Sequence, residues 1–286
     1  MVNNNMLTTV PFDTFMSLEN GTLNETRKRF NINTFKTLPI EEMRSYLIDQ
    51  CGIPLGGKGT SREAYFLDKS DFNMAKGPSC LKLARTKGGV GVYAGIGQNR
   101  EETNILKRFQ HSHDCFPILY SWDSKNYFLI VELGTPLSKA PKSFVSTQFE
   151  PIKETIEDFL EDYEYPKSRH RDYIMRLLDN FQEKTDFTSF IVVVSSIMTD
   201  KEDAKRYKDS EIIWFDEFIN ALKNSDDSIT YSIYETLKFS TQKSAKSILW
   251  YDFEQPANWG FVNRNGYFLL IPIDWGFSKS VADQYY

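Results

Sequence analysis

The clearest pattern of apolar and polar positions lies toward the carboxyl end of the chain. Two apolar runs, Trp259–Val262 and Phe268–Ile273, are separated by the Asn265-Gly266 step. An Asn-Gly step between two apolar runs is a strong signal for a two-residue β-hairpin turn. We therefore expect the two runs to pair as antiparallel strands.

Such a hairpin brings together the polar residues at its two ends. Asn258 stands just before the first strand, and Asp274 stands just after the second. An amide oxygen beside a carboxylate offers the hard oxygen ligands that Mg²⁺ takes together with phosphate oxygens. The alternative is a surface hairpin in which Asp274 only caps a following helix.

Residues 53–67 are typical of two strands joined by a glycine turn. Gly57 and Gly59 would let a phosphate approach the backbone, where a Cβ would obstruct it. Residues 52–58 also fit the G-x-x-x-x-G-K part of a P-loop. However, a P-loop needs Ser or Thr at position 59 and a helix directly afterwards, whereas the following residues are typical of a strand.

Residues 79–84 predict a further strand, which carries a lysine. Alternation places Leu81 and Leu83 on one face and Cys80 and Lys82 on the other. A lysine among small residues can reach into a cleft. The alternative is an edge-strand lysine that points into water.

Helical periodicity over residues 98–109 places Glu102 on the same face as the apolar positions that follow it. Glu101 is the second choice for an inward-facing glutamate. For either residue the alternative is a glutamate that the helix dipole favours near a helix start. Residues 88–97 are expected to form a glycine-rich loop before this helix.

The remaining predicted elements follow from periodicity and short apolar runs. They are helices over 38–51, 151–163, 169–184, 187–198, 210–224 and 229–249, the last with an interruption, and strands over 116–120 and 127–131. Residues 1–35 show little periodicity and are expected to pack loosely. His111, His113 and Cys115 match no zinc spacing, so we expect solvated loop histidines.

Composition narrows the class of protein. The chain has 286 residues, 41% of them hydrophobic, which suits one large domain or two lobes around a cleft. A net charge of −5 argues against a broad nucleic-acid surface. Three cysteines suit reduced thiols in a cytoplasm, and neither a signal peptide nor a membrane-spanning run is apparent.

The order of these features resembles the protein kinase fold. Asp252, Asn258 and the Asp274-Trp-Gly triplet are similar to the catalytic loop and D-F-G triplet of that family, and residues 79–82 align with V-A-I-K. The resemblance implies an α+β, two-lobed fold, with a small antiparallel-sheet N-lobe over 36–131. A mostly helical, truncated C-lobe would cover 132–286.

The resemblance also implies roles for individual residues. ATP phosphates would be held by Gly57, Gly59 and Lys82, with Glu102 as the partner of Lys82. The adenine would contact Cys80 and the hinge that begins with Glu132. Asn258 and Asp274 would bind Mg²⁺. The carboxylate of Asp252 would orient the acceptor hydroxyl.

Two departures from the common pattern bear on function. No His-Arg precedes Asp252, and Asn258 lies six residues on, where the pattern has five, so Glu254 is a second candidate for the acceptor-orienting carboxylate. Only ten residues follow Gly276. The ending resembles minimal serine/threonine kinases of bacteriophages, which implies a protein acceptor and the cytoplasm, that of the host if the chain is phage-encoded. Alternatives are a pseudokinase that acts as a binding module and a small-molecule phosphotransferase.

Overall fold

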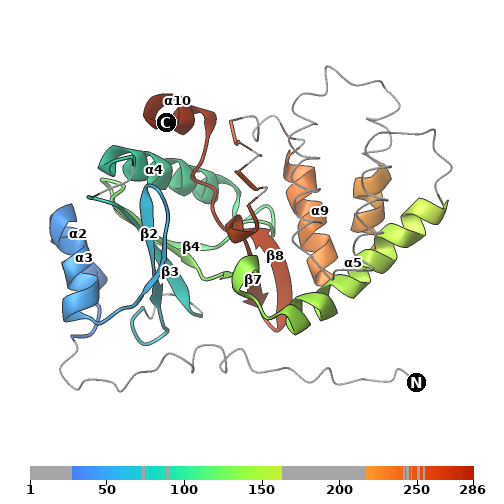
Figure 1. Cartoon of the computed structure of the whole chain (residues 1–286), viewed down its shortest axis with the longest axis horizontal. Coiled ribbons are helices and arrows are strands. Elements are labelled where there is room, and N and C mark those ends of the chain that lie inside the picture. The colour runs from blue at the N-terminus through green and yellow to red at the C-terminus, as the bar shows by residue number, and fades with distance from the viewer. Residues whose placement is uncertain are drawn as a thin grey trace.

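The computed structural model describes residues 28–72, 75, 77–87, 90–162, 217–240, 242, 245, 247–249, 252–253 and 255–286. Within them the chain is an α+β protein with a five-stranded antiparallel sheet and a helical region (Figure 1). The helices expected over 169–184 and 187–198, residues 210–216 of the helix expected over 210–224, and Glu254 lie outside the described residues.

The five-stranded sheet has the order β1-β2-β3-β5-β4. Its strands are β1 (Leu55–Lys58), β2 (Arg62–Leu67), β3 (Ser79–Ala84), β4 (Leu119–Trp122) and β5 (Phe128–Glu132). The predicted strand, glycine turn and strand over 53–67 are confirmed by β1 and β2. Because a strand follows Lys58, the P-loop alternative is wrong. The central position of β3 excludes the edge-strand alternative for its lysine.

Short helices cover one face of this sheet. They are α2 (Ile32–Thr37), α3 (Ile40–Ser45) and the π-helical turn η2 (Tyr46–Gln50). Phe30 and Phe35 are buried against Tyr46 and Phe128. The expectation of loose packing up to residue 35 is therefore wrong for residues 28–35, because their two aromatic rings belong to the core.

The other face of the sheet is covered by α4 (Val92–Phe109), which begins six residues before the expected helix. Residues 92–97 were expected to be loop because of their glycines. Position 95 requires glycine because the backbone of the helix there passes very close to the carbonyl of Ser61 and to Ala84, which leaves no room for a side chain. Tertiary packing thus overrides the low helix propensity of glycine.

Strands β4 and β5 form the predicted pair, but β4 begins at Leu119 instead of Phe116. Pro117 has no backbone N–H to donate to a ladder, so regular pairing starts after it. The turn between the strands is stabilised by Asp123, whose carboxylate accepts from the backbone N–H groups of Lys125 and Tyr127.

A second, three-stranded sheet contains the predicted hairpin. Strands β7 (Trp259–Arg264) and β8 (Tyr267–Pro272) pair in antiparallel fashion, and β6 (Thr135–Pro136) adds to β7. Asn265 and Gly266 both have positive φ, 55° and 90°, as a type I′ turn requires. The hairpin prediction is confirmed.

The helical region packs against this hairpin. It contains α5 (Lys142–Asp162) and α9 (Ser228–Ser240), and residues 217–223 are also helical. The predicted helix over 151–163 in fact starts at Lys142 and carries Pro151 in its interior. The helix continues across the proline because one apolar face runs along it, formed by Val145, Phe149, Ile152, Ile156 and Phe159.

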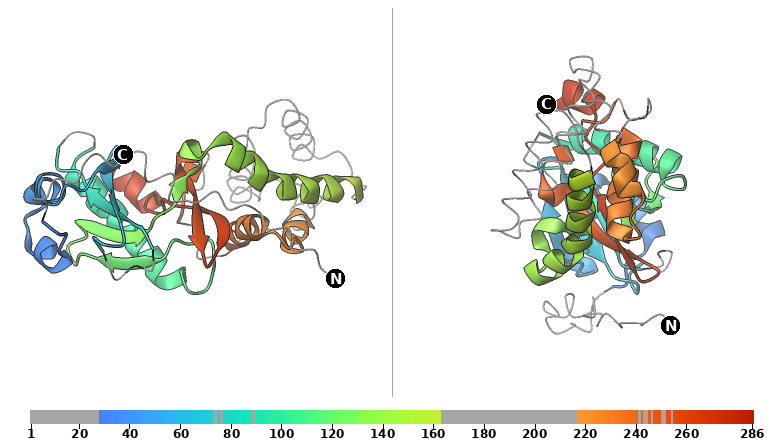
Figure 2. Two further views of the ribbon diagram at one scale, coloured as in Figure 1. Left: turned by 90° about the horizontal axis from the view of Figure 1, so that it is seen from below. Right: turned by 90° about the vertical axis from the view of Figure 1, so that its right-hand side faces the viewer.

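Figure 2 shows an elongated molecule with the five-stranded sheet toward one end and α5 and α9 toward the other. The hairpin lies between these two parts, and α10 (Lys279–Tyr285) packs on α4. None of the helices among the described residues combines the length and the apolar character that a membrane crossing needs. The cysteines are free and buried.

Candidate active site

A cleft of about 480 Å³ opens between the five-stranded sheet and the hairpin. This volume lies within the range of small-molecule sites. Among the residues that line it are eight candidates from the sequence: Gly57, Gly59, Cys80, Lys82, Glu132, Asp252, Asn258 and Asp274. Residues from distant parts of the chain therefore share one cavity.

Lys82 and Glu102 form a buried ion pair. The Nζ atom of Lys82 lies 2.6 Å from Oε1 of Glu102, and it also donates to the carbonyl of Ile273 at 2.6 Å. Alternation along β3 directs Lys82 toward α4, while Leu81 and Leu83 face the opposite core. Glu101 is partly exposed and pairs with Arg100, so Glu102 is the inward-facing glutamate.

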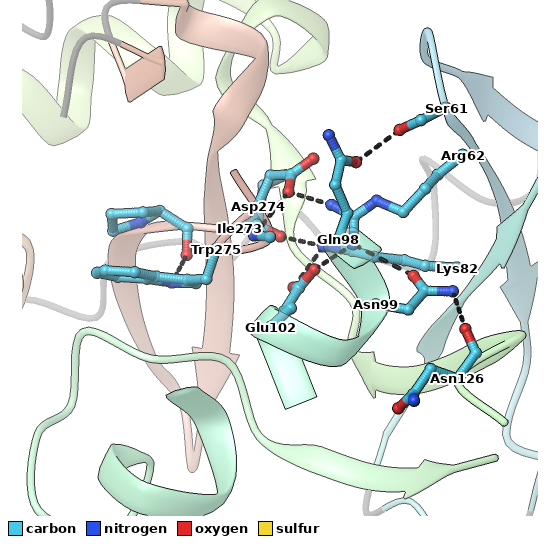
Figure 3. Close-up of polar contacts among 12 residues, drawn as sticks. Ser61, Arg62, Lys82, Gln98, Asn99, Glu102, Asn126, Ile273, Asp274 and Trp275 are labelled. Carbon is cyan, nitrogen blue, oxygen red and sulfur yellow. Dashed lines mark hydrogen bonds and ion pairs between the residues drawn. The ribbon is translucent and has the colours of Figure 1, made fainter. Parts of the chain in front are cut away.

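Arg62 also forms an ion pair with Glu102, and it was not among the site residues predicted from the sequence. Its Nη1 atom lies 2.6 Å from Oε2 of Glu102, and Nη2 forms an ion pair with Oδ1 of Asp274 (Figure 3). Arg62 is only 6% exposed. Two-residue alternation in β2 places it on the face of Ala64, which pairs with Lys82, so strand periodicity was a signal for it.

Asp274 is held in place by its neighbours. The ring of Trp275 is buried 4.3 Å from Phe116 and 5.1 Å from Phe253, measured between centroids, and its Nε1 donates to the carbonyl of Pro272. Gly276 donates from its backbone N–H to Oδ1 of Asp274. The aromatic residue of the triplet therefore anchors the carboxylate to the core.

The loop before the hairpin brings Asp252 and Asn258 to the cleft. Residues Pro256–Asn258 form a single 3₁₀ turn, η7, which takes up the chain between them. The amide Nδ2 of Asn258 donates to the backbone carbonyl of Asp252 at 2.8 Å. Because the amide nitrogen is engaged in this way, Oδ1 of Asn258 remains as a possible oxygen ligand.

The environments of the two aspartates push their pKa values in opposite directions. Burial and the nearby Asp274 carboxylate raise the pKa of Asp252 to about 7, against a lowering effect of Arg62. Burial tends to raise the pKa of Asp274, but the charges of Arg62 and Lys82 outweigh it and hold that pKa below its usual range. Asp274 is thus a fixed anion, whereas Asp252 titrates near neutrality.

The glycine turn between β1 and β2 covers one side of the cleft. Arg85 donates from Nη1 to the carbonyls of Gly59 and Thr60, at 2.7 and 3.2 Å, and so holds the turn in shape. A Cβ at Gly57 or Gly59 would meet only ordinary contacts, and neither residue has a positive φ. Since the fold itself does not require glycine at these two positions, an open approach to the backbone is the simpler reason for them.

The end of β5 and the residues that follow it form another wall. The carboxylate of Glu132 is taken up by Arg264, with Nη2 to Oε2 at 2.6 Å. The carboxylate of Glu132 is therefore already engaged, and its backbone N–H donates to the carbonyl of Ile118. Cys80 pairs with Val131 across the strands, and burial raises the pKa of its thiol to about 11, so Cys80 is a neutral, small wall residue.

No metal cluster of His, Cys, Asp or Glu side chains occurs within the described part of the chain. A cation at Asp274 would need oxygen atoms from Asn258, water and a phosphate, which is how Mg²⁺ is usually bound beside nucleotides. His113 is not the solvated loop residue that was expected, because Nδ1 lies 3.1 Å from Oε2 of Glu235. His111 is exposed, as expected.

Comparison with known proteins gives no match, either to a family model or to a curated protein.

Proposed function

We propose that the chain is an ATP- and Mg²⁺-dependent phosphotransferase with a two-lobed, protein kinase-like fold, and that it acts as a serine/threonine protein kinase of the minimal bacteriophage type. One observation carries the proposal: Lys82 and Asp274 line a single cleft, and Glu102 forms a buried ion pair with Lys82. In the kinase family the corresponding strand lysine holds the α and β phosphates while a helix glutamate orients it.

In the proposed reaction the residues of the cleft have different roles. Lys82 and the glycine turn hold the phosphates, and Cys80 with Val131 packs against the adenine. A bound Mg²⁺ supplies neutralisation of phosphate charge, and Asn258 with Asp274 would hold it. Asp252 accepts a hydrogen bond from the acceptor hydroxyl and takes up its proton, which suits a carboxylate whose pKa is about 7.

The test uses the purified protein, labelled ATP and Mg²⁺, with and without a cell extract. Wild type should transfer label to protein, and Asp274→Asn should stay folded but transfer none. Asp283→Asn, an exposed carboxylate of α10, is the matched control and should behave like wild type. Thermal stabilisation by Mg-ATP should fall in Asp274→Asn alone. Equal stabilisation of all three proteins would remove Asp274 from the site.

One observation favours a second candidate, a pseudokinase that binds nucleotide or a partner without catalysis. The guanidinium of Arg62 is paired with Asp274, the residue that a metal would need. If wild type is stabilised by ATP but transfers no label to any component, this candidate replaces the enzyme. Label found in a small molecule rather than in protein would identify a small-molecule phosphotransferase.

A further inference from the structure

Arg62 occupies the position between the two carboxylates on which the proposed chemistry depends. Its two terminal nitrogens are divided between Glu102 on α4 and Asp274 after β8 (Figure 3). Glu102 in turn divides its oxygens between Lys82 and Arg62. The cluster thus holds two cations and two anions and is neutral as a whole, which is the condition for burying charges at tolerable cost.

The surroundings of the guanidinium are shaped for it. Oδ1 of Asn99 lies 3.4 Å from Nη1, and the amide of Asn99 is itself fixed by donation to the carbonyls of Asn126 and Tyr127. A Cβ at Gly276 would lie 3.0 Å from both Nη atoms of Arg62. The glycine of the Asp-Trp-Gly triplet therefore leaves the space that the guanidinium fills.

Asp274 presents its two oxygens differently. Oδ1 accepts from Arg62 and from the backbone N–H of Gly276, whereas Oδ2 makes no hydrogen bond to any residue in the described part of the chain. The Asp274 side chain is 35% exposed and lines the cleft. Arg62 therefore both orients this carboxylate and supplies the positive charge that a metal would otherwise provide.

We infer that Arg62 is a built-in counter-ion and positioning residue, which holds Asp274 in the metal-free cleft and lowers the affinity of the cleft for a divalent cation. This inference rests on the proposed function, because it takes Asp274 as the metal ligand. A guanidinium and a divalent cation beside one carboxylate repel each other at short range, and their repulsion in a partly buried site is strong. Metal binding is then linked to the release or sharing of Asp274 by Arg62.

The experiment measures thermal stability and tryptophan fluorescence during titration with MgCl₂, alone and with a non-hydrolysable ATP analogue. Arg62→Met keeps the aliphatic stem and removes the charge, so it should be less stable than wild type without metal. It should reach half-maximal stabilisation at a Mg²⁺ concentration at least about tenfold lower. A residue with only a structural role would lower stability without shifting this midpoint.

Arg264→Met is the matched control, because it removes a guanidinium from another largely buried carboxylate, Glu132. It should lower stability but leave the MgCl₂ midpoint unchanged. Should Arg62→Met fail to fold, Arg62→Gln carries the same test: it removes the charge but keeps a polar end beside Glu102 and Asp274, so its midpoint should also lie below that of wild type.

The outcomes separate the inference from the proposed function. If wild type responds to MgCl₂ with the ATP analogue and the Arg62 variants share its midpoint, the inference is overturned and the metal site stands. If wild type shows no response to MgCl₂ under either condition, the metal site itself fails, and the inference fails with it.

Discussion

At the scale of single residues, the carboxylates of the cleft differ in what already binds them. Glu132 is held by Arg264, Asp274 by Arg62, and Glu63 by Arg44 and Tyr65. The side chain of Asp252 makes no hydrogen bond within the described residues. It is therefore the carboxylate most ready to accept a hydrogen bond from a ligand.

We predict that Asp252→Asn lowers the rate of phosphoryl transfer by at least about 10²-fold and leaves nucleotide affinity unchanged. An acceptor-orienting group acts in the chemical step and not in ATP binding. Single-turnover transfer and equilibrium binding of the ATP analogue measure the two effects. Glu254→Gln is the matched control and should change little, and a larger loss in that variant would show that Glu254 is the acceptor-orienting carboxylate.

The raised pKa of Asp252 also predicts a pH dependence of stability in metal-free buffer. The folded state binds the proton more tightly than the unfolded state, so this stabilisation is present below pH 4 and is lost as the pH rises through about 7. Asp252→Asn should therefore be more stable than wild type at pH 8, by on the order of 1 to 4 kcal/mol. Denaturant unfolding at pH 5 and pH 8 gives the comparison, and equal differences at both pH values would contradict the assignment.

Cys80 is expected to set the room available for the base of the nucleotide. Cys80→Phe would fill the part of the cleft that Cys80 and its strand neighbour Val131 line. It should abolish binding of the ATP analogue, with an overpacking cost of about 1–3 kcal/mol. Cys80→Ala leaves the space open and should bind normally. Isothermal titration of both variants is the measurement, and normal binding by the Phe variant would place the base elsewhere.

At the scale of elements, the position of α4 on the sheet decides whether Glu102 can reach Lys82. The first turns of α4 pass over Ser61 and Ala84 at a distance that only glycine permits at position 95. Further along the same helix, Asn99 and Glu102 meet Arg62. The close approach of the helix is thus part of the site.

We predict that Gly95→Ala destabilises the protein by about 1–3 kcal/mol, although alanine is the better helix former. A Cβ there would lie 2.8 Å from the Cβ of Ala84, so α4 has to move outward. Gly77→Ala is the control, because a Cβ at that glycine meets nothing within 4 Å. Urea unfolding of both variants tests the prediction, and equal stability would show that α4 can shift without cost.

At the scale of the whole molecule, Trp275 joins the sheet to the helical region. Its ring contacts Phe116 before β4, Phe239 at the end of α9 and Phe253 in the loop before the hairpin. The core cluster that contains Trp275 also includes residues of α4, α5 and both sheets. The residue next to Asp274 is therefore a centre of the hydrophobic core.

We predict that Trp275→Ala lowers the free energy of unfolding by about 3–5 kcal/mol. Trp275→Phe should lose less, because a ring remains in the cluster. Trp122→Ala is the control, since Trp122 is 40% exposed and should cost much less. Denaturant unfolding measures all three, and a small loss in Trp275→Ala would mean that the aromatic cluster does not join the two parts.

The elements that were predicted correctly are those with a local cause. The hairpin follows from Asn265-Gly266 between two apolar runs. The side of the sheet on which Lys82 lies follows from strand alternation. The strand of Lys82, the inward glutamate and the two ends of the hairpin could all be proposed from the sequence. Each depends on neighbours within a few residues along the chain.

The elements that were missed depend on partners far away in the sequence. The first turns of α4 form despite two glycines. A Cβ at either glycine would collide with a distant part of the chain, with Ala84 at position 95 and with Tyr285 at position 97. Helix α5 runs through Pro151 because its apolar face is buried along its length. Local propensity is worth about 1 kcal/mol per glycine, which tertiary contacts readily exceed.

The sequence by itself determined which side chains are candidates for chemistry and on which strand or helix face most of them lie, because both follow from residue type and from the periodicity of the backbone. Only the tertiary structure decided that Arg62, 212 residues before Asp274, pairs with that carboxylate. An ion pair of this kind is set by how α4, the sheet and the hairpin pack together, and no local pattern along the chain encodes that distance.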